Sequence, residues 1–124
     1  MTDRPVAVVT GASRGIGAAI AARLGAAGYA VRLVSRRADL MDQVAETVRS
    51  KGGTATVHEC DLADRLGVTA LATGFATESA AIDVLVNNAG TVRVGGLSEQ
   101  GGAVWDDVMS VDLWSAFEFA RVLE

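Results

Sequence analysis

The sequence predicts a doubly wound α/β fold, in which helices flank a parallel sheet. Short apolar runs alternate with segments of helical periodicity, and no linker, repeat or low-complexity tract interrupts them. Such alternation is typical of parallel strands joined by right-handed crossovers, with helices on both faces of the sheet. Half of the residues are hydrophobic, which is enough for a core. We therefore expect residues 1–124 to form a single domain.

Four short runs have the composition of strands. The first is almost entirely apolar, as expected of a strand buried on both faces, and the third is rich in β-branched residues. A glycine-rich loop is expected after the fourth. The runs are Val6–Thr10, Ala30–Val34, Thr54–Glu59 and Ile82–Asn87.

Helical periodicity fills the segments between these runs. The first helix is expected to end near Gly28 and the second at Gly52, while Gly67 and Gly74 weaken the third. Residues 103–124 predict a fourth, unusually apolar helix. The marker positions of the first three helices are Ile16, Ile20 and Leu24; Leu40, Val44 and Val48; Leu71 and Phe75.

Three glycines follow the first strand at the spacing G-x-x-x-G-x-G. A strand, a glycine turn and a helix together form a phosphate-binding device, because the helix N-terminus offers free N–H groups and the positive end of its dipole. Gly11 permits the tight turn, Gly15 lets the backbone approach a pyrophosphate, and Gly17 lets the helix pack closely on the strand. A purely structural strand-to-helix turn is the alternative reading of these glycines.

Three motifs in the expected order resemble one family. TGASRGIG (Thr10–Gly17) matches the pattern T-G-x-x-x-G-x-G, NNAG (Asn87–Gly90) ends the fourth strand, and Asp61 closes the third. In these motifs the chain resembles the short-chain dehydrogenases/reductases over essentially all of its residues. The resemblance implies a Rossmann-like dinucleotide-binding fold with the strand order 3-2-1-4, truncated after the fourth helix. It also implies a nicotinamide-dependent oxidoreductase acting on a small-molecule alcohol or carbonyl.

The resemblance also assigns cofactor contacts. Residues of the glycine loop would line the cofactor's phosphates and adenosine ribose, two residues after the third strand would meet the adenine, and NNAG would lie under a ribose. Asn87 would instead tie neighbouring strands, and a simple turn is the alternative reading of NNAG. The candidate contacts are Gly11, Ser13, Arg14, Gly15, Ile16 and Gly17; Asp61 and Leu62; Asn88, Ala89 and Gly90.

The end of the second strand favours NADP(H) over NAD(H). A carboxylate at this position usually reads the 2′-hydroxyl of NAD(H), but here Ser35, Arg36 and Arg37 precede the first acid, Asp39. A carboxylate would repel a 2′-phosphate, whereas an arginine binds one with a fork of N–H groups. Arg14 could reach the same phosphate, and Ser35 could donate a hydrogen bond. Simple surface charge is the alternative for the paired arginines.

The catalytic residues that the resemblance implies are a serine and a Tyr-x-x-x-Lys pair. The lysine lowers the pKa of the tyrosine, whose phenol ionises too weakly at neutral pH without a nearby cation. The single tyrosine, Tyr29, and the single lysine, Lys51, are too far apart in sequence for this motif. The catalytic residues are therefore expected beyond Glu124. On this reading the chain is a nucleotide-binding half domain, inactive by itself.

One catalytic position of the family falls inside the chain. The family often has asparagine in a V-N-L context in the fourth helix, where this sequence has Val111-Asp112-Leu113. Helical spacing places Asp112 in an otherwise apolar stripe, where it would be partly desolvated. A capping or salt-bridge role on a helix edge is the alternative. The stripe is expected to contain Trp105, Met109, Ala116, Phe119 and Leu123.

The last helix also predicts homo-oligomerisation. Trp114 and Phe117 lie off the stripe that holds Trp105 and Phe119, and a helix that is apolar on two faces should be buried on two faces. In the family that the chain resembles, this helix often contacts another subunit. An unpaired fourth strand would provide a second apolar edge.

Composition narrows the other possibilities. A net charge of −4 argues against nucleic-acid or anionic-membrane partners, no apolar run approaches a spanning helix, and the N-terminus does not resemble a signal peptide. The single cysteine, Cys60, fits a reducing compartment, so a cytoplasmic location is expected. His58 and Cys60 lack the partners that a metal site needs.

Two other function classes remain open. A catalytically empty dinucleotide-binding or assembly module would use the same glycines and the apolar last helix. A methyltransferase-like nucleotide domain is a weaker alternative. Such sites usually have an acidic residue near the end of the second strand, where this sequence has Ser35 and Arg36.

Overall fold

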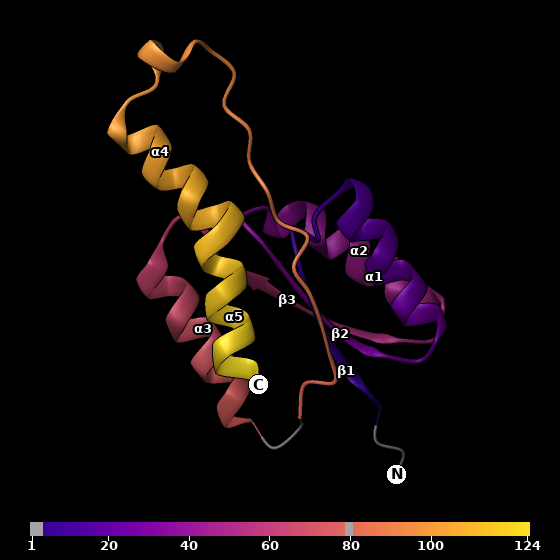
Figure 1. The fold of residues 1–124 in the computed structure, drawn as a ribbon. Coiled ribbons are helices and arrows are strands. Elements are labelled where there is room, and N and C mark those ends of the chain that lie inside the picture. Colours follow the sequence, from indigo (N-terminus) through magenta and orange to yellow (C-terminus); the bar gives the residue numbers. More distant parts are fainter. Residues whose placement is uncertain (1–3, 79–80) are drawn as a thin grey trace.

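The computed structural model describes residues 4–78 and 81–124 and contains one parallel sheet flanked by helices (Figure 1). Strands and helices alternate along the chain, as expected from the sequence. The elements are β1 (Val6–Thr10), α1 (Gly15–Ala26), β2 (Ala30–Ser35), α2 (Ala38–Ser50), β3 (Thr54–Glu59), α3 (Arg65–Thr77), β4 (Val84–Val86), the short 3₁₀ helix η1 (Leu97–Glu99), α4 (Gly102–Met109), the π-helical turn η2 (Ser110–Trp114) and α5 (Ser115–Leu123).

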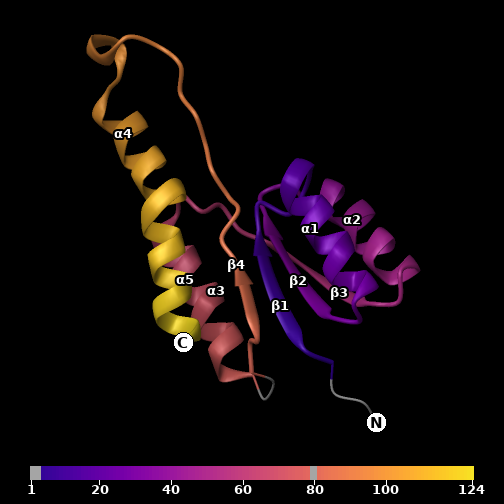
Figure 2. The ribbon, with the colours of Figure 1, turned by 45° about the vertical axis from the view of Figure 1, so that its right-hand side comes forward.

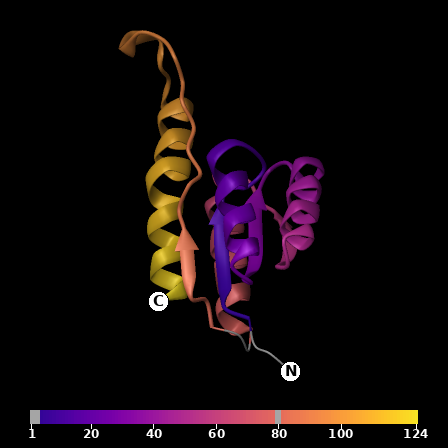
Figure 3. The same ribbon diagram turned by 90° about the vertical axis from the view of Figure 1, so that its right-hand side faces the viewer.

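The sheet has the order β3-β2-β1-β4 with all strands parallel, which confirms the predicted Rossmann-like α/β fold. Helices α1 and α2 cover one face, while α3 and α5 cover the other (Figures 2 and 3). Each crossover returns the chain to the same end of the sheet, so the carboxyl ends of all four strands share one edge. Loops that follow the strands therefore meet there.

The alternation of side chains along β1 builds two cores. Val9 packs with Ala21 and Met41 on the α1–α2 side, whereas Val8 packs with Phe75 and Phe119 on the α3–α5 side. All six residues are completely or almost completely buried. Because neighbouring strand residues point to opposite faces, a strand covered by helices on both sides must be apolar at every position. This explains the unbroken apolar run of β1.

Strand β4 is shorter than the predicted run Ile82–Asn87. The Asp83 carboxylate accepts the Val6 N–H at 2.8 Å, so a side chain replaces a backbone carbonyl just before the strand begins. At the other end, the Asn88 N–H turns to the Thr10 hydroxyl instead of continuing the ladder. In the described part of the chain β4 pairs only with β1, so its other edge is open, as expected.

The last helix is interrupted, which makes the predicted apolar stripe wrong. The π-helical turn η2 shifts the helical register, and α4 extends beyond the sheet while α5 packs on α3 (Figure 1). Trp105 is 65% exposed, whereas Phe119 is fully buried, so the two do not share a buried face. Among the described residues, no helix is long and apolar enough to cross a membrane.

Candidate functional site

A cleft of about 730 Å³ lies at the carboxyl edge of the sheet. The loops after all four strands contribute to it, because parallel strands end at one edge. The candidate residues that line it are Gly11, Ser13, Arg14, Gly15, Ile16, Ser35, Arg36, Asp61, Leu62, Asn88, Ala89 and Gly90. Sequence reasoning missed further lining residues, namely Cys60, Ala63, Thr91, Val92, Arg93, Asp107 and Val111.

Gly17 lies beneath this cleft, where it fixes the shape of the glycine loop. A Cβ on Gly17 would stand 2.2 Å from the carbonyl oxygen of Gly11 and 2.6 Å from Nδ2 of Asn88. Gly11 itself has a φ of 63°, and a Cβ there would come within 2.9 Å of the Ala89 Cα. Only glycine fits either position, so the loop can lie directly against NNAG and α1 can begin beside β1.

Gly15 serves the cleft differently. It has a φ of 59°, yet no atom lies within 4 Å of its hypothetical Cβ. The space above this residue is therefore open, and the left-handed conformation favours glycine. Because α1 begins here and none of the residues in its first turn is acidic, the free N–H groups at its N-terminus face the cleft without a competing carboxylate.

The Thr10 hydroxyl joins the two signature motifs. Thr10 is 2% exposed, and its Oγ1 accepts the backbone N–H groups of Asn88 and Ala89, each at 3.1 Å. The Asn88 side chain completes the link by donating from Nδ2 to the Gly11 carbonyl at 3.2 Å. Thr10 is a residue whose role the sequence did not reveal. Its position at the head of the TGASRGIG motif was the available signal.

The two arginines after β2 have different surroundings. Arg37 donates two hydrogen bonds to Asp39, from Nε at 3.2 Å and from Nη2 at 3.0 Å, and does not line the cleft. This pairing raises the pKa of Arg37 and lowers that of the Asp39 carboxyl. Arg36 lines the cleft, as does Ser35, whose Oγ accepts the Arg37 N–H at 3.1 Å.

Asp112 holds the loop that follows NNAG. Its Oδ1 accepts the backbone N–H of Thr91 at 2.7 Å. Asp112 is exposed, so the expectation of a desolvated carboxylate in an apolar stripe is wrong. Asp112 lies in the π-helical turn η2, and its carboxylate is directed to the loop after NNAG. Asp112 does not itself line the cleft.

Asn87 also differs from its expected role of tying neighbouring strands. Its Nδ2 donates to the carbonyl of Ala116 at 3.4 Å, so it connects the end of β4 to α5.

Cys60 is half-buried at the cleft, and burial, helped by Asp64 and Asp61, raises the pKa of its thiol. A protonated thiol is a weak nucleophile and a poor metal ligand, so Cys60 acts as a small apolar wall residue.

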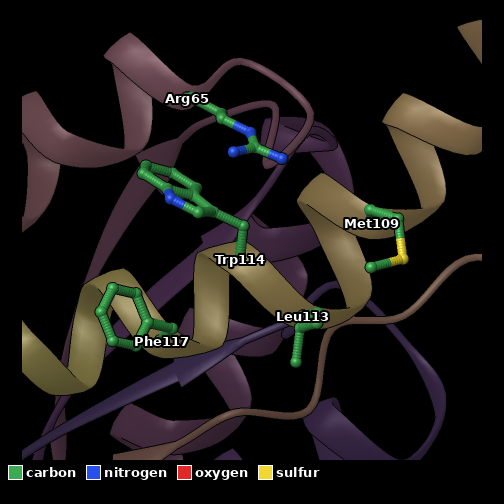
Figure 4. A pocket seen from close by; sticks show the side chains of 5 residues that line it. All are labelled: Arg65, Met109, Leu113, Trp114 and Phe117. Carbon is green, nitrogen blue, oxygen red and sulfur yellow. The ribbon is translucent and has the colours of Figure 1, made fainter.

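A second hollow, of about 370 Å³, lies on the outer face of the last helix (Figure 4). Met109, Leu113 and Phe117 line it from α4, η2 and α5, together with Trp114 and Arg65. The Arg65 guanidinium lies 5.0 Å from the Trp114 ring centroid and donates from Nε to the Ser110 hydroxyl at 3.0 Å. Leu113 and Phe117 are exposed, whereas Trp114 is half-buried and packs against the core on the α3–α5 side.

A sheet with this order and a glycine loop at its carboxyl edge define a Rossmann-like nucleotide-binding domain. The family model "short chain dehydrogenase" matches residues 5–123. The chain belongs to the short-chain dehydrogenase/reductase family, whose members are oxidoreductases.

Individual relatives support this membership. A short-chain reductase protein, NovJ, from Streptomyces niveus is 42% identical over 113 residues, which are 91% of this chain and 43% of that protein. D-threitol dehydrogenase from Mycolicibacterium smegmatis is 36% identical over 115 residues, which are 93% of this chain and 44% of that protein. The chain therefore spans less than half the length of these curated relatives.

Solved structures resemble the fold closely. A metagenomic short-chain oxidoreductase in complex with NADP superposes with a TM-score of 0.90 at 42% identity, over 96% of this chain and 54% of that one. A short-chain dehydrogenase from Sphingobium yanoikuyae in complex with NADPH has a TM-score of 0.89 at 27% identity, over 96% and 46% of the two chains.

Proposed function

We propose that this chain is the nucleotide-binding part of an NADP(H)-dependent short-chain oxidoreductase acting on a small-molecule carbonyl or alcohol. A bound nicotinamide would supply or accept the hydride. The observation that carries the proposal is the cleft, which has an open glycine loop at a helix N-terminus and a cation, Arg36, at the end of β2. The NADP and NADPH complexes of two solved relatives support it.

The residues of the cleft fit a dinucleotide with a 2′-phosphate. Gly11 and Gly17 let the loop lie flat on NNAG, which leaves room for a pyrophosphate above Gly15. Arg36 and Arg14 line the cleft, whereas Asp39, the first acid after β2, is paired with Arg37 and lies outside the lining. We propose that Arg36, not Arg37, binds the 2′-phosphate, with Arg14 and the Ser35 hydroxyl beside it.

The test is titration of the chain with NADPH and with NADH, followed by nicotinamide fluorescence. We expect NADPH to bind more tightly. Arg36→Ala should weaken NADPH binding about tenfold or more and leave NADH binding unchanged, because a phosphate contact contributes roughly 1.5–3 kcal/mol. Arg37→Ala is the matched control and should change neither. Equal effects of the two substitutions would contradict the assignment to Arg36.

The 124-residue chain alone is proposed to be inactive, because the serine, tyrosine and lysine of the family have no counterparts in it. Reduction of any ketone by a pure sample with NADPH would contradict this.

The second candidate function is a non-catalytic dinucleotide-binding or assembly module. The outward apolar hollow beside Leu113 and Phe117 favours this candidate. If the polypeptide made from the native gene has a mass near 12.7 kDa, the module is the better description.

We also propose that the last helix mediates homo-oligomerisation. Trp105, Leu113 and Phe117 are 65%, 60% and 58% exposed, and Leu113 and Phe117 line the outer hollow together with Met109. Phe117→Asp should shift the chain toward monomer in light scattering coupled to gel filtration. Val94→Asp, at a position 95% exposed in the loop before η1, is the control and should not. A parent chain that is monomeric would refute the proposal.

A further inference from the structure

The two ends of the cleft differ in what they offer a ligand. The carboxyl ends of the strands follow the order β3-β2-β1-β4, so Asp61 and Arg36 stand toward one end and the loop after β4 stands at the other. A dinucleotide with its adenosine by β2 and β3, and its pyrophosphate over the glycine loop, has its nicotinamide half toward β4. Side chains of residues 91–93 therefore lie at the reacting end of the proposed complex.

Arg93 is the cation at that end. Its Nη1 donates to the Thr91 hydroxyl at 2.5 Å and to the Val92 carbonyl at 3.3 Å, and these bonds hold the guanidinium against its own loop. In residues 4–78 and 81–124 the ion pairs involve other arginines, and no carboxylate pairs with Arg93. A guanidinium has five N–H donors, so Arg93 has donors left for a ligand in the cleft.

The residues that line the cleft near Arg93 indicate which other groups a ligand could have there. Val92 is 80% exposed and Val111 is half-buried, and both offer apolar contact beside the guanidinium. Asp107 from α4 is the other charged side chain on this side of the lining. In the proposed complex the phosphates of the cofactor lie over the glycine loop and beside Arg36. None of them is therefore close to Arg93.

We infer that Arg93 is a specificity-determining residue that binds an anionic group, a carboxylate or a phosphate, on the substrate. The substrate class would then be ketones and alcohols that carry an acidic group on a short carbon chain. This inference rests on the proposed function, since it places Arg93 by the orientation of a bound dinucleotide. A guanidinium recognises both anions through paired N–H donors, so the chemistry is shared and the experiment separates the two sources.

The test uses the polypeptide made from the complete gene, with NADPH and two matched pairs of probes. Levulinate is compared with its methyl ester, and dihydroxyacetone phosphate with dihydroxyacetone. In one of the two pairs, the anionic probe should have a KM at least about tenfold below that of its neutral partner, and that pair identifies the anion. Arg93→Gln should remove this preference through KM while kcat for the neutral probe stays the same. Asp107→Asn is the matched control and should preserve or increase the preference.

A binding measurement makes the test independent of turnover. Calorimetry with the protein saturated in NADP⁺ should show the preferred anion binding about tenfold more weakly to Arg93→Gln, while NADPH affinity is unchanged. If the parent binds NADPH but neither anionic probe is favoured, in turnover or in calorimetry, the inference is overturned and the proposed function stands. If Arg93→Gln loses NADPH affinity instead, Arg93 is a cofactor contact and the inference is also overturned. Failure of the parent to bind NADPH refutes the proposed function and the inference with it.

Discussion

Substitution of Gly17 by alanine should disrupt the site through one added methyl group. The new Cβ would stand 2.2 Å from the Gly11 carbonyl oxygen and 2.6 Å from Asn88 Nδ2, and these two atoms are hydrogen-bonded to each other. An ordinary contact needs more than 3 Å, so the backbone at Gly11 must move by about 1 Å or more. Overpacking costs about 1–3 kcal/mol and the lost hydrogen bond about 1 kcal/mol, which gives a total of roughly 2–4 kcal/mol.

Two assays measure the effect. The free energy of unfolding in urea should fall by roughly 2–4 kcal/mol, and the Kd for NADPH should rise by at least about tenfold, because the loop leaves its binding conformation. Gly74→Ala in α3 is the matched control. No atom lies within 4 Å of its hypothetical Cβ, and alanine favours a helix by about 0.5–1 kcal/mol, so stability should rise and NADPH affinity should not change. Parental stability and affinity in Gly17→Ala would refute the steric reasoning.

Two further predictions concern Asp112 and His58. Asp112→Ala should speed hydrogen exchange of the Thr91 amide about fivefold, as expected for loss of an exposed hydrogen bond of about 1 kcal/mol, whereas Asp112→Asn retains an acceptor oxygen and should keep the protection. Equal exchange in the two variants would contradict this role. The pKa of His58 is lowered by burial and then by Arg32, although Glu78 opposes the shift. As the pH drops through about 6.5, His58 takes up a proton in the unfolded chain but stays neutral in the folded chain. The free energy of unfolding should therefore fall below about pH 6.5 and level off once the pH is below the pKa of His58 in the folded chain. His58→Gln should remove this part of the pH dependence in urea unfolding, and an unchanged profile would rule out His58 as its source.

The strand segments and the glycine loop were predictable because their causes are local. Val8 and Val9 must both be apolar when helices cover both faces of β1, and this leaves a continuous apolar run in the sequence. Gly11 and Gly15 adopt positive φ, which excludes most other residues, so their spacing is visible without a structure. The short parallel crossovers then leave few possible topologies.

Helical register, in contrast, was decided by tertiary packing. An uninterrupted helix would place Trp105 and Phe119 on one face, but η2 inserts a wider turn between them, so Trp105 is exposed and Phe119 is buried against α3. The same turn directs Asp112 to the Thr91 amide. Periodicity assumes a constant angle per residue, and a single π-helical turn breaks that assumption.

The site itself combines both kinds of information. By itself the sequence determined which segments form the sheet and where glycine is required, since those constraints act between neighbours in the chain. Only the tertiary structure decided that the Thr10 hydroxyl binds the Asn88 amide, 78 residues away, and that Arg36 faces the cleft while Arg37 pairs with Asp39. A hydrogen bond or ion pair needs atoms placed within a fraction of an ångström, and strand register and loop path set that placement after the elements have packed.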